Sequence, residues 1–254
     1  MIDTTPDNSP RQLSLGVQLS DQLTFSNFLT DFFAANGSVQ FREIANLKRW
    51  LEQWCQFPDQ STNDAFVFLA GPSGSGRSHL LQASCHVVAG AGRNAIYLPL
   101  NEFYEKNPEQ ILEGLSDSDL VCIDDLDLVA GNSSWERGLF NLFNEIRDNQ
   151  NYLLVAANAA PGNLGITLPD LTSRLGWGPV FKLPELDDLG KQQLLVFRAG
   201  IRGLELSDDC ARYLLQRASR NNADLIGLLD RLDLASLEQK RSLTIPFIRQ
   251  LLDR

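Results

Sequence analysis

The sequence predicts an α/β fold, with a five-stranded parallel sheet between helices, followed by a small all-helical lid. Three observations support this prediction. Apolar runs of strand length alternate with helical patterns up to about residue 185, a glycine-rich turn joins the first run to a helix, and only helical periodicity follows residue 187. We therefore expect a tail over residues 1–21, an α/β domain over 22–185 and the lid domain over 186–254.

Each element has its own sequence pattern. A helix is predicted over about residues 38–56, since Ile44, Leu47 and Leu51 recur at helical spacing, and another over about 135–148. Apolar runs predict strands over 65–70, 95–100, 120–123, 152–157 and 179–183. The lid is expected to hold helices over about 187–200, 207–219, 222–238 and 244–253, and Ser207 marks one of the helix starts.

The glycine-rich turn has the sequence Gly71-Pro72-Ser73-Gly74-Ser75-Gly76-Arg77-Ser78. Its spacing fits the phosphate-binding pattern G-x-x-x-x-G-K-[ST], except that Arg77 replaces the lysine. Glycines let backbone N–H groups curl around phosphate oxygens, and the N-terminus of the following helix adds partial positive charge. We therefore expect ADP or ATP with Mg²⁺ here, and the candidate binding residues are Gly71, Gly74, Ser75, Gly76, Arg77, Ser78 and His79. The alternative is a strand-to-helix turn that binds no ligand.

The arginine in this turn bears on activity. Lysine is a compact point charge that reaches the β- and γ-phosphates, whereas arginine is a broader planar fork. We therefore expect nucleotide binding to survive at Arg77 and hydrolysis by the chain itself to be weak or absent.

Polar residues follow the third and fourth predicted strands. Asp124 and Asp125 end the run that begins at residue 120, and Asn158 ends the run over 152–157. Asp124 would hold Mg²⁺ together with the Ser78 hydroxyl, and Asp125 would polarise an attacking water. Asn158 is placed to hydrogen-bond a γ-phosphate or to orient that water. The alternatives are a solvated acidic turn for the two aspartates and a simple turn at residues 158–162.

The composition is that of a soluble globular protein. The 254 residues carry a formal net charge of −10, which argues against a broad DNA-binding face, and we expect no direct sequence-specific DNA binding. The four cysteines make no C-x-x-C pair, so we expect buried, reduced thiols. No run approaches the ~18 apolar residues of a membrane span and no signal peptide opens the chain. We expect a cytoplasmic protein with no membrane contact.

The tail contains the peptide Gln12-Leu13-Ser14-Leu15-Gly16-Val17-Gln18-Leu19. A glutamine with several leucines in a polar tail is typical of a short peptide that docks in an apolar groove. The peptide resembles the motif by which bacterial replication proteins attach to the β sliding clamp, which assigns partner contacts to Gln12, Leu13 and Leu15. Gly16 stands where that motif often has an aromatic residue. The alternative is a tail that folds back on its own domain.

Taken in order, these pieces resemble an AAA+ P-loop NTPase module. The stretches 76–81, 123–125 and 168–178 narrow the resemblance to the Hda family (DnaA regulatory inactivators) of DnaA-related AAA+ proteins. Its most specific part is the Ser-Arg-Leu-x-Trp-Gly stretch that contains Arg174, and the resemblance spans about residues 23–254. Arg77, the clamp-binding-like peptide and the lack of a helix-turn-helix domain after the lid favour this family over the initiator itself.

The resemblance implies a regulator of chromosomal replication initiation. Such a protein binds the DNA-loaded sliding clamp and stimulates ATP hydrolysis by the initiator DnaA in trans, which prevents re-initiation. Arg174 would be the arginine finger inserted into the site of DnaA, and Asn158 would be the sensor-1 residue. A homodimer is left open.

One position departs from the family pattern. The lid arginine known as sensor 2 falls at Ala223, with Arg220 one turn earlier, so we expect weak binding of ADP or ATP. Two other interpretations stay open. In the first, the chain is an AAA+ ATPase acting as a helicase loader or remodeller in its own right, which Asp124 and Asp125 favour. In the second, it is an adaptor that links another client to the clamp and hydrolyses nothing.

Overall fold

The computed structural model describes residues 17–29, 39–57, 65–217, 222–239 and 241–252. Its contacts divide the chain into two compact units. The first unit comprises residues 1–25, 47–71 and 77–182, and the second comprises 26–46, 72–76 and 183–254. Each unit is described below by itself.

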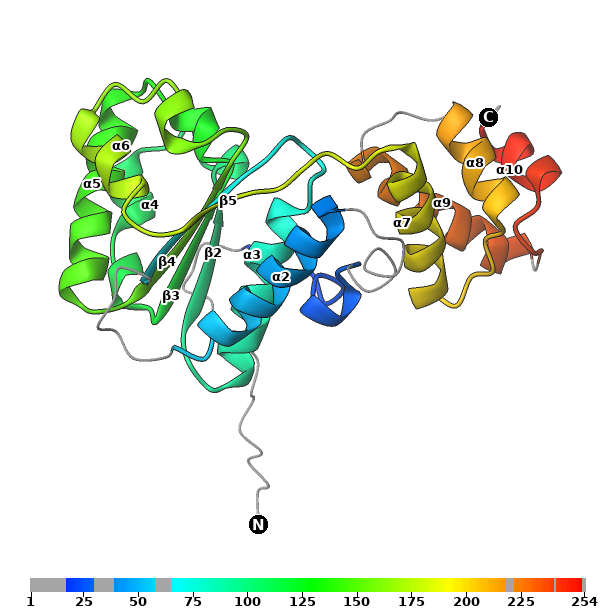
Figure 1. Ribbon diagram of the computed structural model, residues 1–254, viewed down its shortest axis with the longest axis horizontal. Coiled ribbons are helices and arrows are strands. Elements are labelled where there is room, and N and C mark those ends of the chain that lie inside the picture. The colour runs from blue at the N-terminus through cyan, green and yellow to red at the C-terminus, as the bar shows by residue number, and fades with distance from the viewer. Residues whose placement is uncertain (1–16, 30–38, 58–64, 218–221, 240, 253–254) are drawn as a thin grey trace, which may run out of the picture. The chain divides into compact units, whose positions relative to one another are not determined.

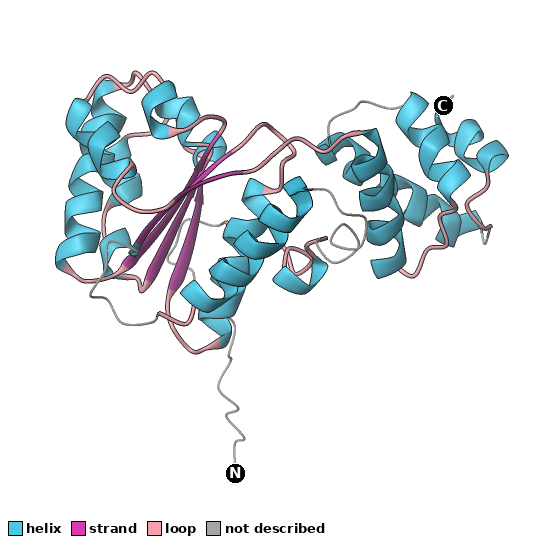
Figure 2. Cartoon of the chain, in the orientation of Figure 1, coloured by secondary structure: helices cyan, strands magenta, loops and turns pink. Residues whose placement is uncertain are grey.

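The first unit is built on a parallel sheet of five strands, which confirms the predicted fold class (Figures 1 and 2). The strands are β1 (Phe66–Ala70), β2 (Ala95–Pro99), β3 (Leu120–Asp124), β4 (Tyr152–Ala157) and β5 (Val180–Lys182), and their order across the sheet is β2-β3-β4-β1-β5. The registers place Ala70 beside Ala157 and Pro99 beside Asp124. Because all strands run the same way, their C-terminal ends meet at one edge, where the polar residues lie.

Helices cover both faces of this sheet (Figure 1). One face carries α3 (Arg77–Gly90) and α2 (Val39–Trp54), and the other carries α4 (Pro108–Leu112), α5 (Ser133–Asp148) and α6 (Pro169–Leu175). Short 3-10 helices connect the elements at η1 (Phe25–Asn27), η3 (Leu100–Glu102), η4 (Leu115–Asp117), η5 (Leu126–Val129) and η6 (Pro161–Asn163). Every residue of β1 to β4 is buried, as expected for a parallel sheet covered on both faces.

Aromatic side chains fill the core between the sheet and α5. Trp135 and Phe143 are each 1% exposed, and the Phe143 ring stacks on Phe66 with centroids 4.1 Å apart. The Trp135 indole N–H donates to the Tyr104 carbonyl oxygen at 3.0 Å, so its one polar atom is satisfied. These contacts fix α5 on the sheet, and α5 in turn supports α6.

The second unit contains the predicted helical lid. Its helices are α7 (Asp188–Ile201), α8 (Asp208–Arg217), α9 (Asn222–Gln239) and α10 (Ile245–Leu252), each within two residues of the predicted bounds. Leu195, Leu214, Leu229 and Phe247 are buried in a core of their own. Asp187 caps α7 by accepting from the Gly190 N–H at 2.7 Å.

The last residues of the predicted tail contact the first unit. Residues 1–16, which include the predicted partner contacts Gln12, Leu13 and Leu15, lie outside the described residues. Val17 packs against the core of the first unit, and the Ser20 N–H donates to Gln82 Oε1 at 2.9 Å. The end of the predicted tail therefore folds onto α3. Among the described residues no helix is long and apolar enough to cross a membrane.

Candidate functional site

The glycine-rich turn between β1 and α3 has the backbone that its sequence predicts. Gly74 and Gly76 adopt φ values of 78° and 96°, which side chains larger than glycine strongly disfavour. The Ser75 N–H donates to the Pro72 carbonyl at 3.1 Å, and the Gly71 N–H donates to Ala157 at the end of β4 at the same distance. The turn is thus tied to the sheet at its first residue and is curled at its centre.

Two observations indicate that the turn fits a phosphate group. The Ser75 hydroxyl is buried and has no hydrogen-bond partner among the described residues, so a donor is left for a ligand oxygen. The helix that follows, α3, is 14 residues long and presents its N-terminus at the turn. An ADP or ATP phosphate would therefore be held by backbone N–H groups of the turn and by Ser75.

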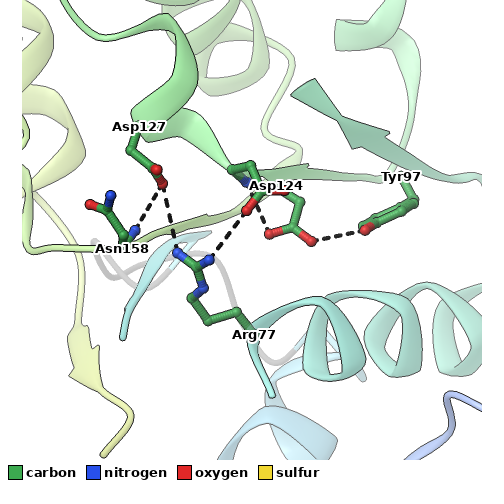
Figure 3. A network of polar contacts seen from close by, with 6 residues as sticks. Arg77, Tyr97, Asp124, Asp127 and Asn158 are labelled. Carbon is green, nitrogen blue, oxygen red and sulfur yellow. Dashed lines mark hydrogen bonds and ion pairs between the residues drawn. The ribbon is translucent and has the colours of Figure 1, made fainter. Parts of the chain in front are cut away.

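Arg77 points from the start of α3 to the acidic residues after β3 (Figure 3). It is 8% exposed, and its Nη2 donates to Asp125 Oδ1 at 3.2 Å. Its Nη1 lies 3.7 Å from Asp127 Oδ1, and that same oxygen accepts from the Asn158 N–H at 2.9 Å. The Arg77 guanidinium is thus paired with two carboxylates, and Asp127 links it to the end of β4.

Asp124 is held by a second set of contacts. It is 1% exposed, its Oδ2 accepts from the Tyr97 hydroxyl at 2.8 Å, and its Oδ1 accepts from the Asp125 N–H at 3.0 Å (Figure 3). Burial, and then the Asp124 charge, raise the pKa of Tyr97, so its hydroxyl stays a donor. Neighbouring Gln82 and Ser78 side chains act on the Tyr97 hydroxyl in the opposite direction and lower its pKa. Hydroxyl and carboxylate oxygens are ligands that Mg²⁺ prefers, so Ser78 and Asp124 are the residues here that would hold it.

Asp125 occupies an unusual backbone position. Its φ of 55° is in the left-handed region, which aspartate tolerates better than most residues. Burial and the neighbouring Asp124 raise the pKa of this carboxyl, against the opposing effect of Arg77. Its carboxylate is engaged by Arg77, so the predicted role of polarising water competes with this ion pair.

His79 and Asn158 are also predicted residues of this site, and they contact different parts of the first unit. The His79 ring Nε2 lies 2.7 Å from the Thr24 carbonyl, so this nitrogen must donate, and the ring anchors the segment before η1. The Asn158 side chain is exposed, and its backbone N–H contacts Asp127. The structure brings Arg77 and Asp125 into direct contact and links Arg77 to Asn158 through Asp127, while His79 faces another part of the first unit.

Arg174 lies on α6 in a setting of its own. Its guanidinium is 4.0 Å from the centroid of the Trp177 ring and 5.9 Å from that of Phe143. Its Nη1 is buried without a hydrogen-bond partner, and Arg174 makes no ion pair with any residue that the structure describes. Trp177 is itself 41% exposed. A guanidinium is therefore held on aromatic rings near the surface, with its charge uncompensated by carboxylates.

Comparison with known families matches nearly the whole described chain. The family model of the bacterial DnaA ATPase domain matches residues 24–182, and that of the Hda lid domain matches residues 188–252. The chain belongs to the Hda family of DnaA-related AAA+ proteins. Membership of the Hda family implies a part in the regulation of replication initiation.

Solved structures share the fold at low sequence identity. Domain III of the replication initiation protein DnaA from Thermotoga maritima is 20% identical, with a TM-score of 0.70, 93% of this chain covered and 98% of that one. AMPPCP-bound DnaA from Aquifex aeolicus is 21% identical, with a TM-score of 0.66 and coverage of 87% and 68%. The Holliday junction branch migration motor RuvB from Thermotoga maritima is 18% identical, with a TM-score of 0.62 and coverage of 84% and 68%.

Two residues of the site in this Hda-family chain were not predicted from the sequence. Tyr97 stood in an apolar run where its hydroxyl was the only side-chain hydrogen-bonding group, which was the available signal. Asp127 gave none, because an acid in a polar turn is usually solvated. In the lid, position 223 falls at the second residue of α9, while Arg220 lies outside the described residues. Within the second unit, Asn222 Nδ2 donates to the Gly74 carbonyl at 2.7 Å.

Proposed function

We propose that this chain binds the DNA-loaded sliding clamp and, while bound there, activates ATP hydrolysis in the initiator DnaA. In this way it restrains chromosomal replication. Arg174 enters the nucleotide site of DnaA as an arginine finger, and the peptide around Gln12 and Leu13 binds the clamp. The Hda-family match supports the choice of DnaA as partner.

The observation that carries this proposal is the contrast between two arginines. Arg77 is 8% exposed and paired with Asp125 and Asp127, so its charge is compensated within the chain. Arg174 has no carboxylate partner among the described residues and is stacked on the exposed Trp177. An arginine whose charge is not compensated within its own chain is suited to stabilise negative charge on another protein.

The chemistry follows from where charge develops. In phosphoryl transfer, negative charge gathers on the γ-phosphoryl oxygens in the transition state, and a guanidinium placed there stabilises it. Arg174 meets this need because a guanidinium carries a positive charge and offers several N–H donors. The finger takes up no proton and forms no bond, and water attacks in the site of DnaA. Such fingers accelerate hydrolysis by about 10³-fold or more.

The chain's own site is proposed to hold nucleotide and not to turn it over quickly. Ser78 and Asp124 would hold Mg²⁺, which neutralises phosphate charge when it is bound with ADP or ATP. Asp125, tied to Arg77, is poorly available to polarise water. We propose that bound nucleotide mainly stabilises the fold around the glycine-rich turn.

The test measures ATP hydrolysis by DnaA with this protein, the clamp and DNA added singly and together. The proposal expects fast hydrolysis only when all components are present. Asp124 and Asp125 at the end of β3 favour a second function, an AAA+ ATPase acting as a helicase loader or remodeller. Brisk ATP turnover by the isolated chain would select that function, and clamp binding without any stimulation would select an adaptor.

A further inference from the structure

A buried carboxylate lies between the helix that supports the sheet and the helix that carries Arg174. Glu136, on α5, is 1% exposed. Its Oε1 accepts from the N–H groups of Gly131 and Thr167 at 2.7 Å and 2.9 Å. Its Oε2 accepts from the Thr167 hydroxyl at 2.6 Å and from the Leu168 N–H at 2.9 Å. Four donors therefore surround one charge.

Three of the four donors belong to Thr167 and Leu168 at the start of α6, and the fourth, the Gly131 N–H, lies just before α5. Leu168 is the residue that precedes the first turn of α6, and its own side chain makes no capping hydrogen bond. Glu136, from another helix, accepts from the N–H of this N-cap residue and from Thr167 before it, and its negative charge lies at the positive end of α6. The carboxylate has no cationic partner among the described residues, so its charge is balanced by hydrogen bonds alone. Glu136 thus acts as a cap that ties α6 to α5.

The other end of α6 rests on the same helix. Phe143 follows Glu136 by two helical turns on α5, and its ring lies 5.9 Å from the Arg174 guanidinium. Leu171 and Leu175 on α6 are 1% and 7% exposed and belong to the same core cluster as Phe143. Because α6 has only seven residues, fixing both ends against α5 fixes the direction in which Arg174 leaves the helix.

We propose that Glu136 is a positioning residue for Arg174. It holds the N-terminus of α6 against α5, so that the Arg174 guanidinium, which stacks on Trp177, keeps one orientation. This inference rests on the proposed function, because it gives the finger a support that is rigid before the partner arrives. Preorganised charge is what makes a finger effective, since a displacement of about 1 Å can cost about 10²-fold in rate.

The test uses the full chain, clamp loaded on DNA, and ATP-bound DnaA. Glu136→Gln keeps the size of the side chain but replaces one accepting oxygen with a donor, so at least one of the hydrogen bonds at Thr167 and Leu168 is lost. Thr167→Val removes only the hydroxyl donor and leaves the charge in place. Glu145→Gln is the matched control, because Glu145 is an exposed carboxylate on the same helix. Arg174→Ala marks the rate without a finger.

Two readouts separate positioning from simple stability. The first is the maximal rate of hydrolysis by DnaA against the concentration of this protein that gives half of that rate. Glu136→Gln should lower the maximal rate at least about ten-fold and leave the half-maximal concentration unchanged, since the finger acts in the transition state. The second is amide hydrogen exchange, in which the Thr167 and Leu168 amides should lose protection while β1 to β4 keep theirs.

Several results would overturn the proposal. Full stimulation by Glu136→Gln, with faster exchange at Thr167 and Leu168, would mean that the cap is structural only. A change confined to the half-maximal concentration would point to partner binding. If Glu136→Gln does not fold, Thr167→Val decides, since an unaltered maximal rate contradicts positioning and a reduced one supports it. Undiminished stimulation by Arg174→Ala would instead reject the proposed function, and with it any finger for Glu136 to position.

Discussion

At the scale of single residues, the arginine in the glycine-rich turn would set the affinity of this site for a phosphate group. The guanidinium of Arg77 has two nitrogens that reach Asp125 and Asp127 at the same time, at 3.2 Å and 3.7 Å. A lysine ammonium is a point charge and cannot span two carboxylates in this planar way. The two aspartates would therefore compete with a bound phosphate for Arg77 and would also repel it.

This competition predicts that Asp127→Asn tightens nucleotide binding. The amide keeps an oxygen for the Asn158 N–H but removes one negative charge from the site, and about 1 kcal/mol of relieved competition corresponds to about five-fold in Kd. Calorimetric titration with ADP and Mg²⁺ measures the change. Asp148→Asn is the control, because Asp148 is an exposed acid paired with Arg147 on the same unit. Weaker binding by Asp127→Asn would show that the charge holds the site together.

At the scale of elements, the junction of α5 with α6 adds a pH-dependent contribution to stability. Burial alone would raise the pKa of Glu136, but the hydrogen bonds from Thr167, Gly131 and Leu168 outweigh it and lower the pKa. A carboxyl whose folded pKa lies below its unfolded one stabilises the fold above the unfolded pKa. That stabilisation is lost as pH falls through the folded pKa.

Unfolding by denaturant across pH tests this prediction. At neutral pH, Glu136→Gln should lower the free energy of unfolding by about 1–3 kcal/mol, because buried donors lose their acceptor. The difference from the wild type should shrink as pH falls below 4.5, the ordinary pKa of this group, because the unfolded wild-type chain then takes up a proton that the folded chain binds only at lower pH. A difference that is constant across pH would contradict the assigned charge.

The elements themselves could be predicted from the sequence, and their junctions could not. The strands lie in local apolar runs such as 152–157, and the phosphate-binding turn has a fixed local spacing. By contrast, Arg77 and Asp125 are 48 positions apart, and Glu136 and Thr167 are 31 apart. A glutamate in an amphipathic helix usually faces water, so nothing near Glu136 in sequence indicates that it caps another helix. Partners of this kind are set by tertiary packing.

At the scale of the whole molecule, we propose that the tail binds the clamp and that Arg174, in the folded part of the chain, activates DnaA. We predict that Gln12→Ala combined with Leu13→Ala abolishes retention on immobilised clamp, measured by surface plasmon resonance. Both side chains would be lost from an apolar groove of the clamp, while thermal unfolding of the chain should not change. Ser9→Ala, in the same tail, is the control. Undiminished retention of the double variant would remove the peptide from the account.

We propose that Arg174 activates ATP hydrolysis in a partner protein. The most direct measurement is the rate at which ATP-bound DnaA hydrolyses its nucleotide on clamp-loaded DNA, with the wild type, Arg174→Ala and the control Arg212→Ala compared at equal clamp occupancy. Arg212 is an exposed arginine paired with Asp209 in the lid. We expect a loss of about 10³-fold with Arg174→Ala and none with Arg212→Ala. Equal rates for all three proteins would contradict this proposal.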